Sequence, residues 1–330
     1  TEADDAQATG ALLVSLYGAV SVTNGGLIQA VAEGDVANAT GVGAIGLAGT
    51  GVSVTNSGQI IAAANGDDAT ATALRMESAS INKLVNSGSI SALGDGERIA
   101  ISSEGTATAD ILNTGTITGA IQTGSLDDRL VNGSGGKWFA LGASKFGDGN
   151  DSLTNAAGGL IDVVGGTIAM EAGNDTITNH GTFRLTGGTV TMGAGTNAFT
   201  NVGILKVLGT SAVDVGAAGT LTNISSIDFI DGATDDKLTV TGTLAGAGVL
   251  NLDLNLLTST VDQVVVTGNV AASAVQTVNV QAPGLPTTAH TSAVFGRVSG
   301  TSTASNFVAG QIFGYSPANF LDLDLTVSSQ

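Results

Sequence analysis

Three aspartates occupy the same place relative to a recurring asparagine. Asp128, Asp151 and Asp175 each lie four residues before an asparagine, and Asn197 has that place in the following copy. If the copies stack like neighbouring strands, about 5 Å apart, the carboxylates repel one another. A hard cation such as Ca²⁺ relieves this repulsion, because it prefers carboxylate oxygens. The spacing therefore leaves two interpretations, a calcium site or three solvated corner aspartates that bond their own backbone.

A second acidic series lies in the first third of the chain. Asp35, Asp67 and Glu97 each follow an asparagine by eleven residues, and Asp68 and Asp95 lie close to them in the same Gly-Asp loops. Acidic loops at one phase of a repeat predict a negative stripe along one edge of the molecule. We take these five residues as the candidate contact surface, with plain solvated loops as the alternative.

Residues suited to catalysis are scarce, so we expect no enzyme. The chain has no cysteine, no Gly-x-Ser-x-Gly elbow and only two histidines, His180 and His290. His180 follows a recurring asparagine, in a slot that Ser, Thr or Val fills elsewhere. The stretch Gly41-Val-Gly-Ala-Ile-Gly46 has dinucleotide-motif spacing, but no helix is indicated after it. Trp138 is the only tryptophan, which argues against an aromatic groove for polysaccharide.

Charge narrows the range of partners. The formal net charge is -18, with ten basic residues scattered along the chain. Phosphate binding needs clustered Lys and Arg, so nucleic acid is not expected as a partner. Docking onto anionic lipid is disfavoured for the same reason. No apolar run approaches the roughly 20 residues of a membrane helix, so we expect no direct membrane insertion.

The elements that position these residues come from the recurring asparagine itself. A short apolar stretch ends in asparagine again and again, in the clearest copies as Asn-x-Gly. The copies are Asn56, Asn86, Asn113, Asn155, Asn179, Asn201 and Asn223, with an early copy at Asn24 and a shortened one at Asn132. A motif that returns at such short steps along the chain indicates a stack of similar supersecondary units.

One unit contains three short strand signals. They are Thr182–Leu185, Thr189–Met192 and Ala198–Thr200, with Gly and Asn between them. Three strands and three corners between Asn179 and Asn201 predict one coil of a right-handed parallel β-helix, an all-β solenoid. The asparagines are expected to adopt the left-handed conformation at a corner and to bond one another as a ladder.

The repeat length divides the chain into three regions. Residues 1–131 carry wide coils with the acidic loops, and residues 132–228 carry shorter, regular coils. After Asp228 the pattern changes to a pair of similar segments, Asp236-Lys-Leu-Thr-Val-Thr-Gly242 and Asp262-Gln-Val-Val-Val-Thr-Gly268. Residues 229–330 are therefore predicted as final coils with a β cap, which covers the open end of the stack.

The Asn-Ser-Gly-x-Ile repeats with Gly-Asp loops resemble the β-helical stalk of a bacterial autotransporter passenger, a product of type V secretion. The segment from Asp236 to Val270 is similar to the autochaperone region of that family. The resemblance covers nearly the whole chain. It implies export across the outer membrane to the bacterial cell surface, a C-terminal region that nucleates folding, and a partner β-barrel that this chain does not contain.

Passengers of this kind differ widely in activity, so the functional expectation stays general. The resemblance implies a virulence-type adhesin or structural stalk, whose partner is a host surface, matrix or glycan, or another copy of itself. Two alternatives stay open. One is a polysaccharide-binding or polysaccharide-degrading β-helix, and the other is an inert stalk for a functional head upstream of residue 1.

Overall fold

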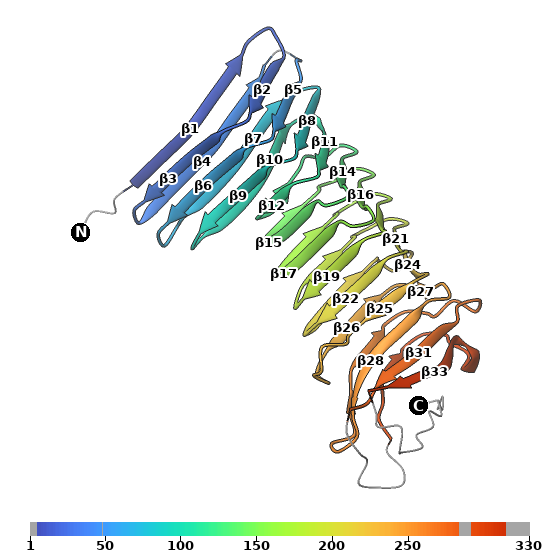
Figure 1. Ribbon diagram of the computed structural model, residues 1–330. Coiled ribbons are helices and arrows are strands. Elements are labelled where there is room, and N and C mark those ends of the chain that lie inside the picture. The colour runs from blue at the N-terminus through green and yellow to red at the C-terminus, as the bar shows by residue number, and fades with distance from the viewer. Residues whose placement is uncertain (1–4, 48, 284–291, 315–330) are drawn as a thin grey trace.

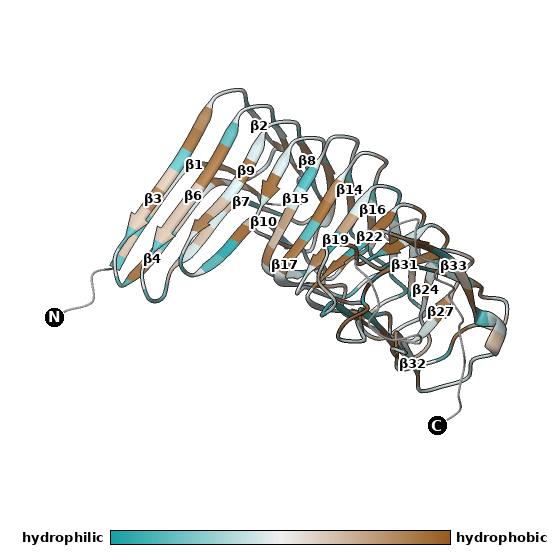
Figure 2. Cartoon of the chain, turned by 60° about the horizontal axis from the view of Figure 1, so that its bottom comes forward, coloured by the Kyte–Doolittle hydropathy of each residue, from teal (hydrophilic) through white to brown (hydrophobic). Residues whose placement is uncertain are grey.

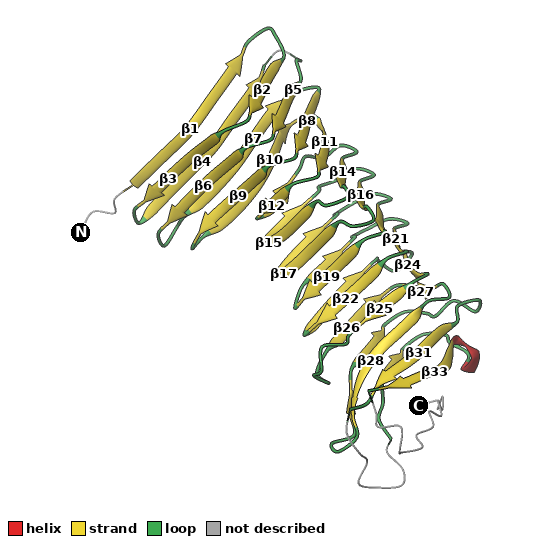
Figure 3. Cartoon of the chain, viewed as in Figure 1, coloured by secondary structure: helices red, strands yellow, loops and turns green. Residues whose placement is uncertain are grey.

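The computed structural model describes residues 5–47, 49–283 and 292–314. Parallel strands stack in register over the whole of this length and confirm the prediction of a right-handed parallel β-helix (Figures 1 and 3). The one helical element in these residues is the 3-10 turn η1 (Ala304–Asn306). No helix in the described part of the chain is long and apolar enough to cross a membrane.

Each regular coil has three faces, as the sequence predicted. The three strand signals correspond to β21 (Ala198–Asn201) on the first face, β19 (Thr182–Thr186) on the second and β20 (Thr189–Thr191) on the third, each to within one residue at either end. The first, the asparagine face, is a ten-stranded parallel sheet. Its strands are β2 (Val20–Asn24), β5 (Val52–Asn56), β8 (Ile81–Asn86), β11 (Thr108–Asn113), β14 (Arg129–Asn132), β16 (Ser152–Asn155), β18 (Thr176–Asn179), β21 (Ala198–Asn201), β24 (Thr220–Asn223) and β27 (Thr243–Ala245).

The second and third faces form one continuous sheet, because two strands run around the corner between them. These are β15 (Lys137–Lys145) and β17 (Leu160–Ala169). The second face holds β3 (Leu27–Glu33), β6 (Gln59–Asn65), β9 (Ser89–Gly94), β12 (Thr116–Thr118), β19 (Thr182–Thr186), β22 (Ile204–Leu208), β25 (Ser226–Asp228), β28 (Val249–Asn255), β31 (Gln276–Gln281) and β33 (Phe307–Phe313). The third face holds β1 (Asp5–Ser15), β4 (Val36–Gly46), β7 (Thr70–Ser78), β10 (Glu97–Gly105), β13 (Ala120–Gln122), β20 (Thr189–Thr191), β23 (Thr210–Asp214), β26 (Lys237–Thr241), β30 (Gln263–Val266) and β32 (Gly296–Val298).

A ladder of asparagine side chains fixes the register of the coils. The Nδ2 of each ladder asparagine donates to the Oδ1 of the asparagine in the next coil, at 2.7–2.9 Å from Asn24 to Asn223. Gln276 ends the ladder by accepting from Asn223 at 2.8 Å. The expected left-handed backbone is wrong, since the ladder asparagines are absent from the described non-glycine residues with positive φ. Hydrogen bonding, not backbone conformation, therefore explains asparagine at this position.

Apolar side chains stack inside the coils in the same register. One column takes a single fully buried residue from each second-face strand between β6 and β28, β15 and β17 included: Ile60, Ile90, Ile117, Trp138, Ile161, Phe183, Leu205, Ile227 and Leu250. The strands bury every second residue, and hydrophobic and hydrophilic bands alternate along several of them (Figure 2). The continuous core makes each coil depend on its neighbours.

Side-chain volume follows coil shape. The first coils carry long third-face strands, and alanines such as Ala37, Ala39, Ala71 and Ala73 fill their interior. Later coils have third-face strands of three to five residues and enclose large side chains; Phe183 and Phe199 pack with ring centroids 5.4 Å apart. Small interior residues thus accompany the wide coils, which narrow toward the middle of the molecule (Figure 1).

The region from residue 229 continues the stack and adds a hairpin. Strand β29 (Thr260–Val261) turns back antiparallel to the end of β28. Beyond it, Phe295 and Phe307 pack edge to face at 5.8 Å. The rest of the predicted cap, residues 284–291 and 315–330, lies outside the described residues.

Candidate functional site

The structure brings Asp128, Asp151 and Asp175 together in one column, directly before strands β14, β16 and β18. The backbone N–H of Asp128 donates to Oδ1 of Asp151 at 2.8 Å, and that of Asp151 donates to Oδ1 of Asp175 at 2.9 Å. The column continues at both ends, through Ala109 N–H to Asp128 and through Asp175 N–H to Asn197. We call Asp128, Asp151, Asp175 and Asn197 the acid ladder.

The carboxyls of the acid ladder point inward. The three aspartates are 0–2% exposed, so the expected solvated corner residues are wrong. Left-handed glycines such as Gly147 and Gly149 turn the chain tightly just before Asp151, and this places the carboxyl under the corner. In each aspartate the second oxygen, Oδ2, is buried without a hydrogen-bond partner.

Asn197 shows that a hydrogen-bond donor fits at the place where the aspartates carry Oδ2. Its Nδ2 donates to the backbone carbonyl of Met192 at 2.7 Å, and to those of Gly193 and Val215 at 3.3 Å. The corresponding atom of each aspartate is Oδ2, which can donate only when the carboxyl is protonated. The surroundings of the acid ladder therefore favour the protonated form of the three aspartate carboxyls over the ionised form.

Electrostatics point the same way. Burial raises the pKa of Asp151 to about 8, and the charges of Asp128, Asp175 and Asp127 add to the rise. Burial also raises the pKa of Asp128 and of Asp175. No group of three or more His, Cys, Asp or Glu side chains within the described ranges could hold a metal ion. The geometry thus gives the calcium interpretation no support, because the carboxyls serve backbone N–H groups and line no cage.

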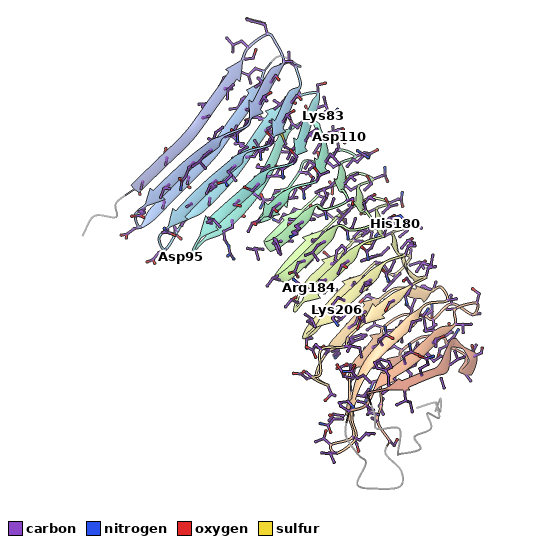
Figure 4. The ribbon with its side chains drawn as sticks, viewed as in Figure 1. Lys83, Asp95, Asp110, His180, Arg184 and Lys206 are labelled. Atoms are coloured by element: carbon purple, nitrogen blue, oxygen red, sulfur yellow. The ribbon has the colours of Figure 1, made fainter. Side chains whose placement is uncertain are left out.

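The acidic loops of the first coils lie on the surface, at the corner between the second and third faces. Asp35, Asp67, Asp68, Asp95 and Glu97 are all exposed, and the N–H of Asp68 donates to the carbonyl of Asp35 at 3.0 Å. Figure 4 shows Asp95 at this edge. The stripe therefore exists as a row of neighbouring turns, which we call the acidic edge.

Within the acidic edge, Glu97 does not stack at the level that counting eleven residues from Asn86 predicts. Glu97 pairs with Thr70 at the start of the third-face strands, not with Asp67. The turn before it holds only two residues, whereas the turn before Thr70 holds four, Gly66 to Ala69. Asp95 is thereby the residue that stacks at the level of Asp68.

Four basic side chains of the described structure pair with acids of neighbouring coils. Arg129 contacts Asp110 at 2.9 Å, Lys206 contacts Asp228 at 3.3 Å, and Arg184 forms an ion pair with Asp162. Arg184 and Lys206 lie side by side on the second face (Figure 4). By contrast, the aspartates of the acidic edge take part in no ion pair within the described structure. Negative charge is therefore uncompensated at this edge.

The remaining chemistry-bearing residues have structural positions. Trp138 is fully buried and donates its indole N–H to the carbonyl of Gly119 at 3.1 Å, so it lines no sugar groove. His180 is an exposed corner residue on the asparagine face, and His290 lies outside the described residues. Gly41 to Gly46 belong to β4, and a Cβ at Gly41 would come within 2.5 Å of the Ala73 carbonyl oxygen. Close packing, not phosphate binding, accounts for that glycine.

Sequence reasoning missed a second set of buried acids, Asp236, Asp253 and Asp262, which are 0–3% exposed. Two of them, Asp236 and Asp262, begin the pair of similar segments, which was the available signal. Asp253 gave no such signal. The regular alternation of the sequence places it on the outward-facing side of β28, but the alternation of buried residues breaks there. Comparisons of the chain with models of protein families, with curated proteins and with solved structures found no match.

Proposed function

We propose that this chain is a surface-exposed passenger of the autotransporter kind, which acts as an adhesin or structural stalk through the side of its β-helix. The observation that carries the proposal is the acidic edge. It is a row of exposed acids without ion-pair partners in the described structure, on a long and regular stack. In contrast, the inward-facing asparagines bond one another between coils, and the acid-ladder carboxyls each accept a backbone N–H from the preceding coil.

An extended surface suits this arrangement better than catalysis in a pocket. Repeat stacks present one chemical feature many times in a row, and their binding surfaces are correspondingly long. The asparagine ladder runs through nine consecutive coils, so the spacing of the acidic turns is held rigidly. Contact through such an edge requires a partner with basic or cation-bridged groups, such as a matrix protein, a charged glycan or a second copy with divalent ions.

Surface display tests the proposal. The chain, placed ahead of an autotransporter barrel on a non-adherent bacterium, is expected to increase aggregation or attachment to host matrix and glycans. The variant Asp67→Asn with Asp68→Asn is expected to reduce that gain, and adding Asp35→Asn and Asp95→Asn is expected to abolish it. These side chains are exposed, so the fold is expected to persist, as circular dichroism of the purified variants would verify.

The matched control removes two exposed charges at another corner, through Asp148→Asn and Glu171→Gln. It is expected to adhere like the unchanged chain. Equal loss in both variants would mean that net charge, not the acidic edge, governs attachment. Display without any gain, with and without calcium, would contradict the adhesive function and leave the chain as a stalk.

A further inference from the structure

A buried carboxyl joins two strands near the C-terminal end of the described stack. Asp262, directly before β30 (Gln263–Val266), is fully buried. Its Oδ1 accepts the N–H of Asp236 at 3.2 Å, and its Oδ2 accepts the N–H of Asp253 at 2.7 Å. One side chain therefore ties the residue before β26 to the second half of β28.

Two more buried carboxyls extend these contacts to the surrounding turns. Oδ2 of Asp253 accepts the N–H groups of Asp231 and Gly232, both at 2.8 Å. Asp236 accepts the N–H of Gly209 from the preceding coil. We call Asp236, Asp253 and Asp262 the carboxyl knot. It connects β26, β28, β30, the loop before β26 and the corner after β22.

The knot is poorly equipped to hold three negative charges. Oδ2 of Asp236 and Oδ1 of Asp253 are buried without a hydrogen-bond partner. Asp231 and Asp235 from the adjoining loop add negative charge near Asp236, against a single facing cation, Lys206 of β22. Lys237 lies on the outward-facing side of β26 and lines the cleft beside the knot, and β29, β30 and β31 bring no charged side chain. Full ionisation would leave three buried carboxylates that repel one another, and the backbone N–H groups that they accept offset only part of this cost.

Water can reach the knot from one side. A cleft of about 320 Å³ lies beside it, lined among others by Asp235, Asp236, Thr260 and Gln263. Protons can therefore exchange with solvent without unfolding of the coils.

We propose that the carboxyl knot binds protons and acts as a pH-sensitive clasp, which holds the coils around β26, β28 and β30 closed in mildly acidic solution and loosens them as the pH rises through neutrality.

The direction follows from linkage between protonation and folding. Burial raises the pKa of Asp262 to about 7; the N–H groups of Asp253 and Asp236 lower it in part, and the charges of the same two residues raise it. Burial, with Asp231 and Asp235, raises the pKa of Asp236 to about 6. Folded values above the ordinary 3.8 mean that the protonated knot favours the closed state. This contribution is complete below about pH 4 and is lost as the pH rises through 6 to 7.

Hydrogen exchange of the full chain tests the clasp. Peptides covering residues 229–266 would be followed by mass spectrometry from pH 5 to 8.5, with rates corrected for intrinsic exchange. Peptides from residues 52–94 serve as an internal reference, because that stretch contains no buried carboxyl. The ratio of exchange in the knot peptides to the reference is expected to rise at least about tenfold over this range. A constant ratio, or one that falls with pH, would overturn the proposal without any variant.

Substitutions assign the effect to the knot. Asp236→Asn with Asp262→Asn removes the two knot carboxyls whose pKa burial raises, so the exchange ratio is expected to stay nearly flat with pH. The single variant Asp262→Asn serves if the double variant does not fold, and is expected to remove most of the rise. Asp235→Asn, an exposed neighbour, is expected to keep it. A pH-dependent rise that survives in the knot variants would contradict the assignment.

Discussion

Asp151→Asn is expected to stabilise the protein in alkaline solution and to leave its stability at pH 4 nearly unchanged. In the folded chain Oδ1 of Asp151 accepts the N–H of Asp128, while Oδ2 is buried without a partner. Asparagine reproduces the shape of a protonated carboxyl and adds a donor at the second position. Asn197 already makes this arrangement in the same ladder.

The expected size follows from the pKa of Asp151. Burial raises it from the ordinary 3.8 to about 8, so the folded state binds the proton more tightly than the unfolded state. The stabilising contribution is complete below about pH 4, falls as the pH rises, and is gone above about pH 8. The difference between the two pKa values corresponds to roughly 6 kcal/mol as an upper bound. We expect the variant to be more stable than the unchanged chain by about 2–5 kcal/mol at pH 9, after relaxation of the surroundings.

Urea unfolding followed by circular dichroism at pH 4 and pH 9 measures this difference. The matched control is Asp148→Asn, an exposed aspartate three residues away in the same corner, and it is expected to shift the midpoint little at either pH. A loss of stability in Asp151→Asn at pH 9 would mean that the carboxylate is ionised and required. Stabilisation of the unchanged chain by calcium at that pH would then revive the cation site.

The fold could be predicted from the sequence because the asparagine marks the same point of each coil. Once that register was set, the strands at Thr182–Thr186, Thr189–Thr191 and Ala198–Asn201 followed from alternation and glycine spacing. The count failed at Glu97, where a turn shortens by two residues. A change of turn length alters the register of everything after it, and sequence composition does not reveal it.

Burial of the acid ladder could not be predicted from residue type. Aspartate is rarely buried, so solvated corners were the reasonable expectation for Asp128, Asp151 and Asp175. Left-handed glycines turn the corner inward before Asp151 and Asp175, and Asp128 takes the same inward position in the stack. The available hint was the replacement of aspartate by asparagine at position 197. Asparagine can replace aspartate where the site needs a hydrogen-bond donor and the same side-chain shape, but not where it needs a negative charge.

Replacing a ladder asparagine in the middle of the stack is expected to cost about 3–6 kcal/mol. Asn179 is fully buried and accepts from Asn155 at 2.8 Å. Its Nδ2 donates to Oδ1 of Asn201 at 2.8 Å and to the carbonyl of Ile204 at 3.0 Å. Asn179→Ala removes all three bonds and leaves a small cavity, so groups in two neighbouring coils lose partners while they stay away from water.

Two further variants serve as controls, one at the end of the ladder and one that tests the backbone conformation of Asn179. Asn24 stands at the first rung, is 6% exposed and bonds one ladder neighbour, so Asn24→Ala is expected to cost about 1–2 kcal/mol. Asn179→Gly distinguishes a hydrogen-bonding role from a turn-forming role, since glycine enters any turn without strain. Because Asn179 has no positive φ, we expect Asn179→Gly to be at least as destabilising as Asn179→Ala in urea unfolding. If Asn179→Gly instead unfolded at the midpoint of the unchanged chain, the side-chain ladder would contribute nothing measurable, and backbone pairing with core stacking would have to hold the coils in register alone.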